Sequence, residues 1–164
     1  MELQCGYLAD HPELLDVVAQ WAHVEWFAAE GSSRAEALDA YRARCQRDQL
    51  PLTLLAWEAD RVVGMVSLIY DYGPDDDTEL PCLGGLYVVP EQRKRGIGRQ
   101  LCASVVAAAA RLGLRRLTLF TQDHAEFYAR LGWGNQRIVH AEIAGEWRPL
   151  HMLELAIEPT PQQS

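Results

Sequence analysis

A short basic turn with two glycines has the residue types and spacing best suited to chemistry in this chain. It reads Arg93-Lys94-Arg95-Gly96-Ile97-Gly98-Arg99, and an Ala- and Leu-rich segment follows that we expect to be a helix over residues 97–112. The first amides of a helix have no partner inside the helix, and the helix dipole adds partial positive charge to them. Glycines let a ligand come close to this backbone. The turn is therefore suited to bind a phosphate or a pyrophosphate.

The distribution of charge supports an anion site at this turn. The chain has a formal net charge of −8, yet four of its 15 Lys and Arg residues, including its single lysine, Lys94, fall within residues 93–99. Two common phosphate motifs are absent from the sequence. No Gly-x-x-x-x-Gly-Lys-Ser/Thr segment occurs, and Leu101 stands where a dinucleotide-binding fingerprint needs its third glycine. An ordinary tight turn before a helix is the alternative interpretation.

Two further segments contain candidate functional residues. Phe127-Tyr128-Ala129-Arg130-Leu131-Gly132-Trp133 lies about 30 residues beyond the basic turn and places an ionisable hydroxyl in a short helix. A buried core tyrosine is the alternative interpretation of Tyr128. The pair Gly84-Gly85 lies inside an expected strand, where adjacent glycines indicate a bulge or a close approach to the backbone.

The elements that must position these segments alternate between helices and strands, without repeats or linkers. Helix starts are indicated by Asp10-His11-Pro12-Glu13, Ser33-Arg34-Ala35-Glu36 and Asp123-His124-Ala125-Glu126. Strands are expected over residues 3–8, 53–57, 62–70, 82–89, 116–120, 136–143 and 149–157. Strand–helix–strand units give parallel pairs and hairpins give antiparallel ones, so this order predicts an α/β fold with a mixed sheet.

Size and composition indicate one globular domain of 164 residues, with 49% hydrophobic and 23% charged residues. The longest apolar run, Val105 to Ala110, is too short to cross a membrane, and the first residues lack the basic start of a signal peptide. We therefore expect a cytoplasmic location and no membrane partner. The net charge argues against a nucleic-acid partner. The four cysteines show no paired spacing, so we expect reduced thiols, and a homodimer stays open.

The basic turn and the Tyr128 segment together resemble the signatures of the GNAT superfamily of N-acetyltransferases. Residues 93–98 match its Arg/Gln-x-x-Gly-x-Gly/Ala motif, and residues 127–133 match its aromatic-Tyr-x-x-Leu-Gly-Phe/Trp segment. The resemblance implies an α/β (α+β) GNAT fold, with a mixed central sheet of about seven strands and about four helices. It implies a single domain over residues 1–157, and we expect a disordered tail over residues 158–164.

The resemblance also implies an acyltransferase that moves an acetyl group from acetyl-CoA directly to a primary amine. A backbone amide near Gly85 would polarise the thioester carbonyl, and Tyr128 would protonate the leaving thiolate. The resemblance implies that the coenzyme is held at Leu86, Tyr87, Val88, Lys94, Arg95, Gly96, Ile97, Gly98 and Arg99. No metal is expected.

The general base and the acceptor stay open at this point. Many relatives place a carboxylate on the glycine-bulged strand, but residues 82–88 contain none. The candidates for the base are Glu25, Asp71, Glu79 and His124, of which we select Glu79. Candidates for an acceptor pocket are Trp21, Trp26, Trp57 and Tyr72, although aromatic residues at such positions are more often core.

An acidic loop suggests a class of acceptor. Residues 71–79 contain five carboxylates: Asp71, Asp75, Asp76, Asp77 and Glu79. Such a loop would attract a cationic amine, and a flexible solvated loop is the alternative. A small polyamine or aminoglycoside and a peptide N-terminus are both retained as acceptors. A non-catalytic module that binds and senses acyl-CoA is the alternative from another functional class.

Overall fold

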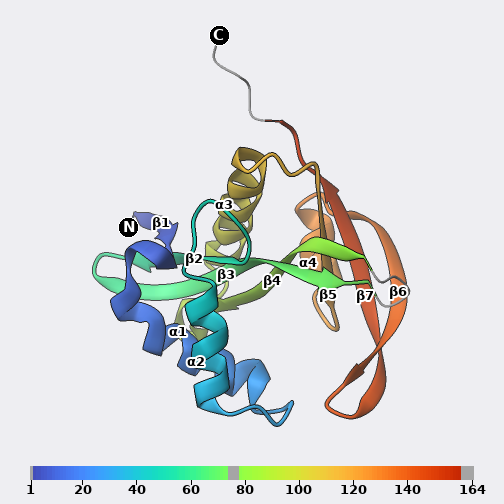
Figure 1. The fold of residues 1–164 in the computed structure, drawn as a ribbon. Coiled ribbons are helices and arrows are strands. Elements are labelled where there is room, and N and C mark those ends of the chain that lie inside the picture. Colours follow the sequence, from blue (N-terminus) through green and yellow to red (C-terminus); the bar gives the residue numbers. More distant parts are fainter. Residues whose placement is uncertain (1, 74–77, 160–164) are drawn as a thin grey trace.

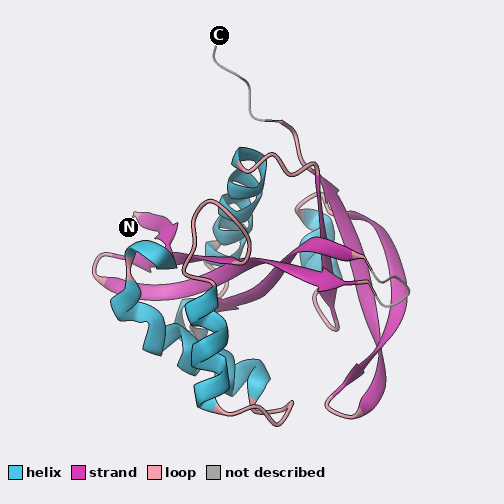
Figure 2. Cartoon of the chain, viewed as in Figure 1, coloured by secondary structure: helices cyan, strands magenta, loops and turns pink. Residues whose placement is uncertain are grey.

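The computed structural model describes residues 2–73 and 78–159, and within them seven strands form a single mixed sheet (Figures 1 and 2). The strand order is β1-β2-β3-β4-β5-β7-β6. The strands are β1 (Leu3–Tyr7), β2 (Leu52–Glu58), β3 (Arg61–Tyr72), β4 (Glu79–Val88), β5 (Arg116–Thr121), β6 (Gly134–Ile143) and β7 (Glu146–Ala156). The helices are α1 (Leu15–Ala22), α2 (Arg34–Ala43), α3 (Ile97–Arg111) and α4 (Ala125–Arg130).

Helices cover both faces of the sheet, because successive residues of a central strand point to opposite sides. Figure 1 shows α1 and α2 on one side of the strands and α3 on the other. The core is correspondingly divided. One cluster joins α1 and α2 to the sheet and includes Val18, Tyr41, Leu55 and Met65. The other joins α3 and α4 to the sheet and includes Leu54, Val66, Leu101, Val105 and Tyr128.

The sheet opens between β4 and β5, which form its parallel pair. A single pair of partners, Cys82 and Thr118, joins these two strands in the described part of the chain. Beyond this pair, residues 83–88 of β4 have no described partner on the β5 side. β4 leads into α3 and β5 leads into α4. The opening therefore lies toward the ends of the strands where both helices begin.

Several local predictions are confirmed. The β2–β3 hairpin forms, and α3 begins at Ile97. The capping box at the start of α2 is present, since the Ser33 hydroxyl accepts from the Glu36 amide and the Glu36 carboxylate accepts from the Ser33 amide, each at 3.1 Å. The glycine pair of β4 lies at a register shift. All four cysteines are free.

Other local predictions are wrong. The chain makes two 3-10 turns, Leu8–Asp10 and Pro12–Leu14, before α1 begins at Leu15, so Asp10 caps no α-helix. Asp123 does not cap α4, because the Thr121 hydroxyl accepts from the His124 amide at 3.1 Å instead. β3 extends to Tyr72 and β4 begins at Glu79, so both strands run into the segment predicted as a loop.

One structural feature was not predicted, and two segments for which predictions were made lie outside the described residues. α1 continues directly into a π-helical turn, His23–Phe27. The acidic residues Asp75, Asp76 and Asp77 and residues 160–164 of the tail lie outside the described residues, so the predictions made for them stay predictions. Within the described ranges, no helix is both long and apolar enough to cross a membrane.

Candidate functional site

The N-terminus of α3 is exposed and uncapped. Lys94 and Gly96 adopt positive φ values of 66° and 84°, which turn the chain sharply from β4 into α3. Among the described residues no side chain caps the first amides of α3, and a Cβ at Gly96 would meet no atom within 4 Å. These amides therefore donate to no side chain of the described residues, and the space above Gly96 is open. This arrangement fits a pyrophosphate, which would accept several hydrogen bonds there.

The basic residues of the turn are not equivalent. The Arg93 guanidinium folds back on β4 and donates to the Val88 carbonyl at 2.8 Å. Arg95 forms an ion pair at 2.9 Å with Glu58, which is buried at the end of β2. Lys94 and Arg99 are exposed and form no ion pair within the described residues. Among the residues predicted to contact the coenzyme, Lys94 and Arg99 therefore have positive charges that no carboxylate of the described residues pairs with.

β4 carries a bulge where it faces the opening of the sheet. Gly84 pairs with Ser67 and Tyr87 pairs with Met65, so Gly85 and Leu86 together stand opposite one residue of β3. Gly85 has a φ of 60°, a conformation that residues with a Cβ rarely adopt. The bulge interrupts the ladder at Leu86, next to the predicted coenzyme contacts Tyr87 and Val88. A backbone amide released from a ladder can donate to a developing oxyanion.

A polar cluster, composed of Tyr41, Arg44, Thr53 and Ser67, packs against this bulge from the α2 side. A Cβ at Gly85 would lie 3.1 Å from the Tyr41 hydroxyl, 3.6 Å from Arg44 Nη1 and 3.7 Å from Ser67 Oγ. Arg44 Nη1 donates to Ser67 Oγ at 3.2 Å, and the hydroxyls of Ser67 and Thr53 are 2.7 Å apart. Thr53 and Ser67 are fully buried. The cluster therefore links β2, β3 and α2 to the back of the bulge.

The sequence reasoning missed this cluster. Burial raises the pKa of Tyr41, while the Arg44 charge and hydrogen bonds from Ser67 and Arg44 act against that rise. The Arg44 guanidinium also stacks on the Tyr41 ring, 4.3 Å from its centroid. One local signal was available, since Ser67 interrupts an apolar run on β3. Nothing near it along the chain pointed to Arg44, 23 residues away.

Tyr128 is buried on α4, with 7% of its surface exposed. Its ring contacts those of Phe127 and Trp133, at centroid distances of 5.0 and 6.1 Å. Burial is the main cause that raises the pKa of Tyr128, and Cys102 on α3 raises it further. A Cβ at Gly98 would lie 3.5 Å from Phe127, so the first turn of α3 and α4 are in close proximity. The fold thus brings the two motif segments together.

Glu79 lies far from these residues. It is exposed at the start of β4 and accepts a hydrogen bond from the Tyr72 hydroxyl at 3.1 Å. It lies six positions before Gly85, which is about 20 Å along an extended strand. Glu25, Asp71 and His124 are likewise exposed. In the described residues, no group of three or more His, Cys, Asp or Glu side chains could hold a metal ion.

Two of the four candidate pocket aromatics gather at β4. The rings of Trp21 and Trp26 lie 5.2 and 6.5 Å from the ring of Tyr87. Trp57 instead contacts the ring of His11 near the β1 edge, and the Tyr72 hydroxyl donates a hydrogen bond to Glu79. The π-helical turn that carries Trp26 thus faces the strand that holds the bulge.

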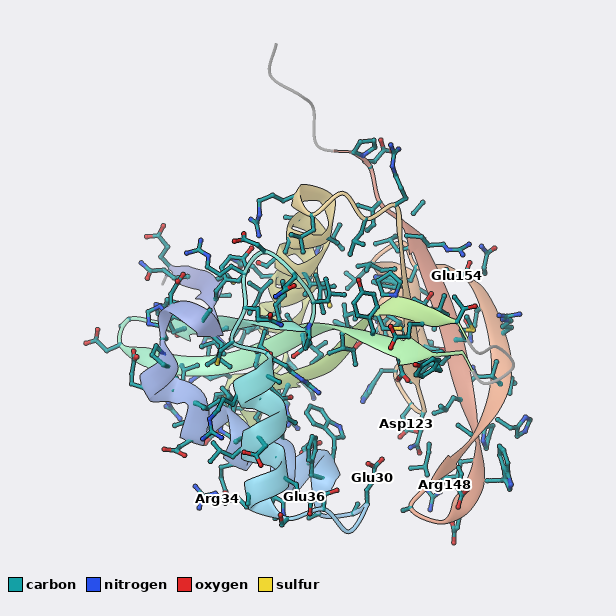
Figure 3. The ribbon with its side chains drawn as sticks, in the orientation of Figure 1. Glu30, Arg34, Glu36, Asp123, Arg148 and Glu154 are labelled. Atoms are coloured by element: carbon teal, nitrogen blue, oxygen red, sulfur yellow. The ribbon has the colours of Figure 1, made fainter. Side chains whose placement is uncertain are left out.

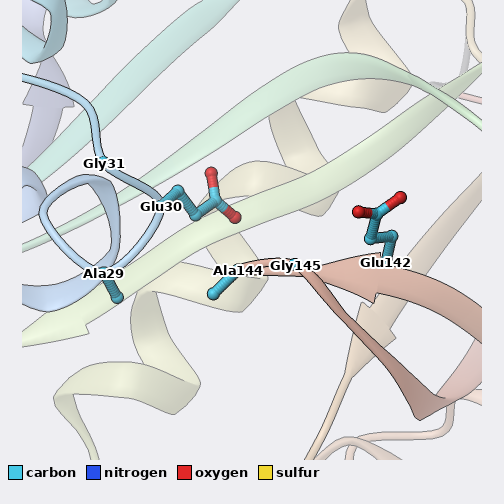
Figure 4. Close-up of a pocket in the computed structure, with 6 residues that line it drawn as sticks. All are labelled: Ala29, Glu30, Gly31, Glu142, Ala144 and Gly145. Carbon is cyan, nitrogen blue, oxygen red and sulfur yellow. The ribbon is translucent and has the colours of Figure 1, made fainter.

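A separate, open hollow of about 560 Å³ lies at the surface. Its walls are the connection between α1 and α2 and the turn between β6 and β7 (Figure 4). Glu30 stands on the first wall and Glu142 on the second. In Figure 3, Glu30 rises from the loop before α2, and Arg148 lies on the neighbouring hairpin. The two exposed carboxylates make this hollow acidic.

Residues 15–133 match the acetyltransferase (GNAT) family. The chain belongs to this family. It is an acetyl-CoA-dependent acyltransferase, and the uncapped α3 N-terminus fits the phosphates of that co-substrate. No curated protein sequence matches the chain.

Solved structures support the fold of this acetyltransferase. An aminoglycoside 6'-N-acetyltransferase complexed with coenzyme A is 20% identical and has a TM-score of 0.73, over 99% of this chain and 100% of that one. An aminoglycoside 6'-acetyltransferase type Ii is 24% identical, with a TM-score of 0.71 over 98% and 100%. NAA60 of Arabidopsis thaliana, in complex with a bisubstrate analogue, is 16% identical, with a TM-score of 0.72 over 97% and 100%. The GNAT fold predicted from the sequence is confirmed.

Proposed function

We propose that this acetyltransferase transfers the acetyl group of acetyl-CoA directly to a primary amine, either a small cationic amine or a peptide N-terminus. The observation that carries the proposal is the uncapped N-terminus of α3 beside the open, bulged edge of β4. An anion cradle and a free strand edge are what a pyrophosphate and a pantetheine arm require. The proposal includes a single domain over residues 1–157 and a cytoplasmic location.

Each residue of the proposed site has a defined task. The amides of residues 94–99 hold the pyrophosphate, and the main chain of Leu86, Tyr87 and Val88 pairs with the pantetheine arm. Acetyl-CoA supplies an activated thioester. The amide at the bulge stabilises the charge that develops on the carbonyl oxygen as the C–N bond forms. Tyr128 donates its proton to the sulfur as the C–S bond breaks, and the proton of the amine leaves to solvent or a base.

The acidic hollow supports a cationic acceptor. Glu30 and Glu142 stand on its two walls, one on the connection between α1 and α2 and one at the turn between β6 and β7. Two carboxylates attract a polyamine or a basic peptide and repel an acidic peptide.

The general base is a separate question. Glu79 lies about 20 Å along the strand from Gly85, so this position does not support Glu79 as the base.

The decisive experiment pairs two glycines at opposite ends of α3. Gly96 and Gly113 have φ values of 84° and 80°, and a Cβ at either would meet nothing within 4 Å. Gly96→Glu and Gly113→Glu therefore carry the same backbone strain and the same added charge. We expect calorimetry to show stoichiometric acetyl-CoA binding by wild type and by Gly113→Glu. Gly96→Glu should bind none, because a carboxylate would occupy the cradle.

Turnover tests the proposed acceptor class. CoA release in the presence of polyamines, aminoglycosides or peptides would identify the acceptor. Binding of acetyl-CoA without CoA release across this panel would refute an acceptor of these classes. Equal binding by the two glycine variants would refute the α3 cradle.

A further inference from the structure

Arg44 places a positive charge behind the bulge of β4. It is the C-terminal cap of α2, and its side chain is half-buried. A guanidinium stays protonated at every pH at which proteins work. Within residues 2–73 and 78–159, no ion pair joins Arg44 to a carboxylate. Partial burial of an unpaired charge is unfavourable, so this position calls for a further explanation.

The contacts of Arg44 direct its charge toward Gly85. Arg44 Nη1 donates to Ser67 Oγ at 3.2 Å, and the guanidinium stacks on the Tyr41 ring, 4.3 Å from its centroid. Gly85 has no side chain on this side, and a Cβ there would lie 3.6 Å from Arg44 Nη1. The charge is therefore held beside the backbone of the bulge, where the proposed function places the thioester carbonyl and the attacking amine.

Tyr41 is an ionisable group in direct contact with Arg44. Burial raises the pKa of Tyr41, so the phenol keeps its proton through the neutral range. Burial also raises the pKa of the Cys45 thiol, the next residue along the chain. A neutral phenol and a neutral thiol do not accept a proton from an ammonium group.

The carboxylates on the elements around Arg44 do not pair with it. Asp39 on α2 and Glu58 at the end of β2 each pair with another arginine. His23 on the π-helical turn contacts a backbone carbonyl of the loop before α2, at 3.1 Å. The other carboxylates on α1, the π-helical turn, α2, β3 and β4 are exposed: Asp16, Glu25, Glu36, Asp71 and Glu79.

A fixed positive charge alters the ionisation of an amine nearby. Because like charges repel, it disfavours the ammonium form and lowers the pKa of that group. For a nitrogen about 8 Å from the guanidinium and an effective dielectric constant of about 30, the pKa falls by about 1. An amine bound at the bulge is then neutral in a larger fraction of complexes at neutral pH.

We propose that the positive charge of Arg44 favours the neutral form of the acceptor amine at the bulge, so that its proton leaves to water without a general base on the protein. The inference rests on the proposed function, which places the acceptor there. Attraction of a cationic acceptor by surface carboxylates concerns the encounter, whereas Arg44 acts on the reacting nitrogen after binding.

The proton balance of this route is complete. The acceptor ammonium gives one proton to water, and the free lone pair attacks the carbonyl carbon. The nitrogen loses its second proton to water as the amide forms. The C–S bond breaks, the thiolate takes the proton of Tyr128, and Tyr128 regains one from water. The products are the amide, CoA and one proton in solution.

The test measures kcat by CoA release between about pH 6 and about pH 10. The acceptor is whichever of spermidine and a basic peptide with a free N-terminus is turned over faster. The pH dependence of kcat reports ionisation in the bound complex, and that of kcat/KM reports the free acceptor and enzyme. For wild type we expect the rising limb of kcat to lie about one pH unit below that of kcat/KM.

Three variants separate charge from structure. Arg44→Gln should move the rising limb of kcat about one pH unit upward, so that kcat falls about tenfold at neutral pH and approaches wild type at alkaline pH. Arg44→Lys keeps the charge and should keep the limb in place. Arg34→Gln is the matched control, because Arg34 is exposed at the opposite end of α2 (Figure 3). It should leave the limb in place as well.

Two results would overturn the inference while the proposed function stands. One is a wild-type limb of kcat at the same pH as that of kcat/KM, which needs no variant to be observed. The other is a loss of kcat in Arg44→Gln that is equal at every pH, because a purely structural role lowers turnover without moving the limb. Absence of CoA release by wild type with every acceptor would instead refute the proposed function, and the role of Arg44 with it.

Discussion

Tyr128 lies where several features of a proton donor coincide. It is buried between α4 and α3, its ring is fixed by Phe127 and Trp133, and burial raises its pKa. A phenol whose pKa lies above its ordinary value of about 10 keeps its proton throughout the neutral range. It is therefore available as an acid throughout the neutral range.

Tyr128→Phe should remove that proton and little else. We expect kcat to fall about 10²–10⁴-fold, the scale of general acid catalysis, with the Kd for acetyl-CoA unchanged. The sign of the pH dependence follows from the raised pKa. Turnover by wild type should show no loss due to Tyr128 until the pH passes that pKa on the alkaline side. Steady-state kinetics between neutral and alkaline pH would measure both effects.

Tyr7 provides the matched control for this substitution. It is also a buried tyrosine, and its hydroxyl has no hydrogen-bond partner among the described residues. Tyr7→Phe should leave kcat unchanged and should not lower the free energy of unfolding. Equal turnover by Tyr128→Phe and Tyr7→Phe would show that Tyr128 only packs in the core.

At the scale of elements, β4 depends on α2 for the shape of its bulge. The cluster formed by Tyr41, Arg44, Thr53 and Ser67 occupies the space behind Gly85. An amide used to stabilise an oxyanion must be held in place before the reaction. We therefore expect the cluster to position the bulge, although none of its members is required to touch the substrate.

Ser67→Ala should affect both stability and turnover. It removes the hydroxyl that partners both the buried Thr53 hydroxyl and Arg44 Nη1, which should cost about 1–3 kcal/mol in the free energy of unfolding. The double variant Thr53→Val/Ser67→Ala removes both hydroxyls and should recover the part of that cost due to Thr53. If the cluster positions the bulge, kcat stays low in the double variant, while the Kd for acetyl-CoA is unchanged. Recovery of kcat together with stability would show that the cluster only supports the fold.

At the scale of the whole molecule, charge is divided between two regions. The chain carries a net charge of −8, and its basic turn at residues 93–99 is the local exception. The hollow between the α1–α2 connection and the β6–β7 turn carries Glu30 and Glu142. A phosphate-bearing donor and a cationic acceptor would thus be attracted to different regions of the surface.

The double variant Glu30→Gln/Glu142→Gln tests this division. We expect the KM for its best polyamine acceptor to rise about threefold to tenfold, the scale of two exposed charge interactions. The KM for acetyl-CoA should stay constant, and the effect should shrink as salt is raised. Asp16→Asn/Asp60→Asn removes the same charge from exposed positions elsewhere and is the control. An equal rise in both double variants would indicate only the loss of net charge.

The sequence by itself determined the features that depend on neighbours along the chain. The capping box of Ser33 and Glu36, the β2–β3 hairpin, the start of α3 and the bulge at Gly84-Gly85 all follow from residues a few positions apart. The two motif segments and the family they indicate were likewise readable. Their backbone geometry depends on local capping, turn and glycine preferences, which act within a few residues.

Only the tertiary structure decided which distant residues meet. Arg44 reaches Ser67 because α2 packs on β3, and Arg99 and Arg130 line one groove because α3 lies beside α4. The order of strands in the sheet sets these distances, and no short stretch of sequence contains that order.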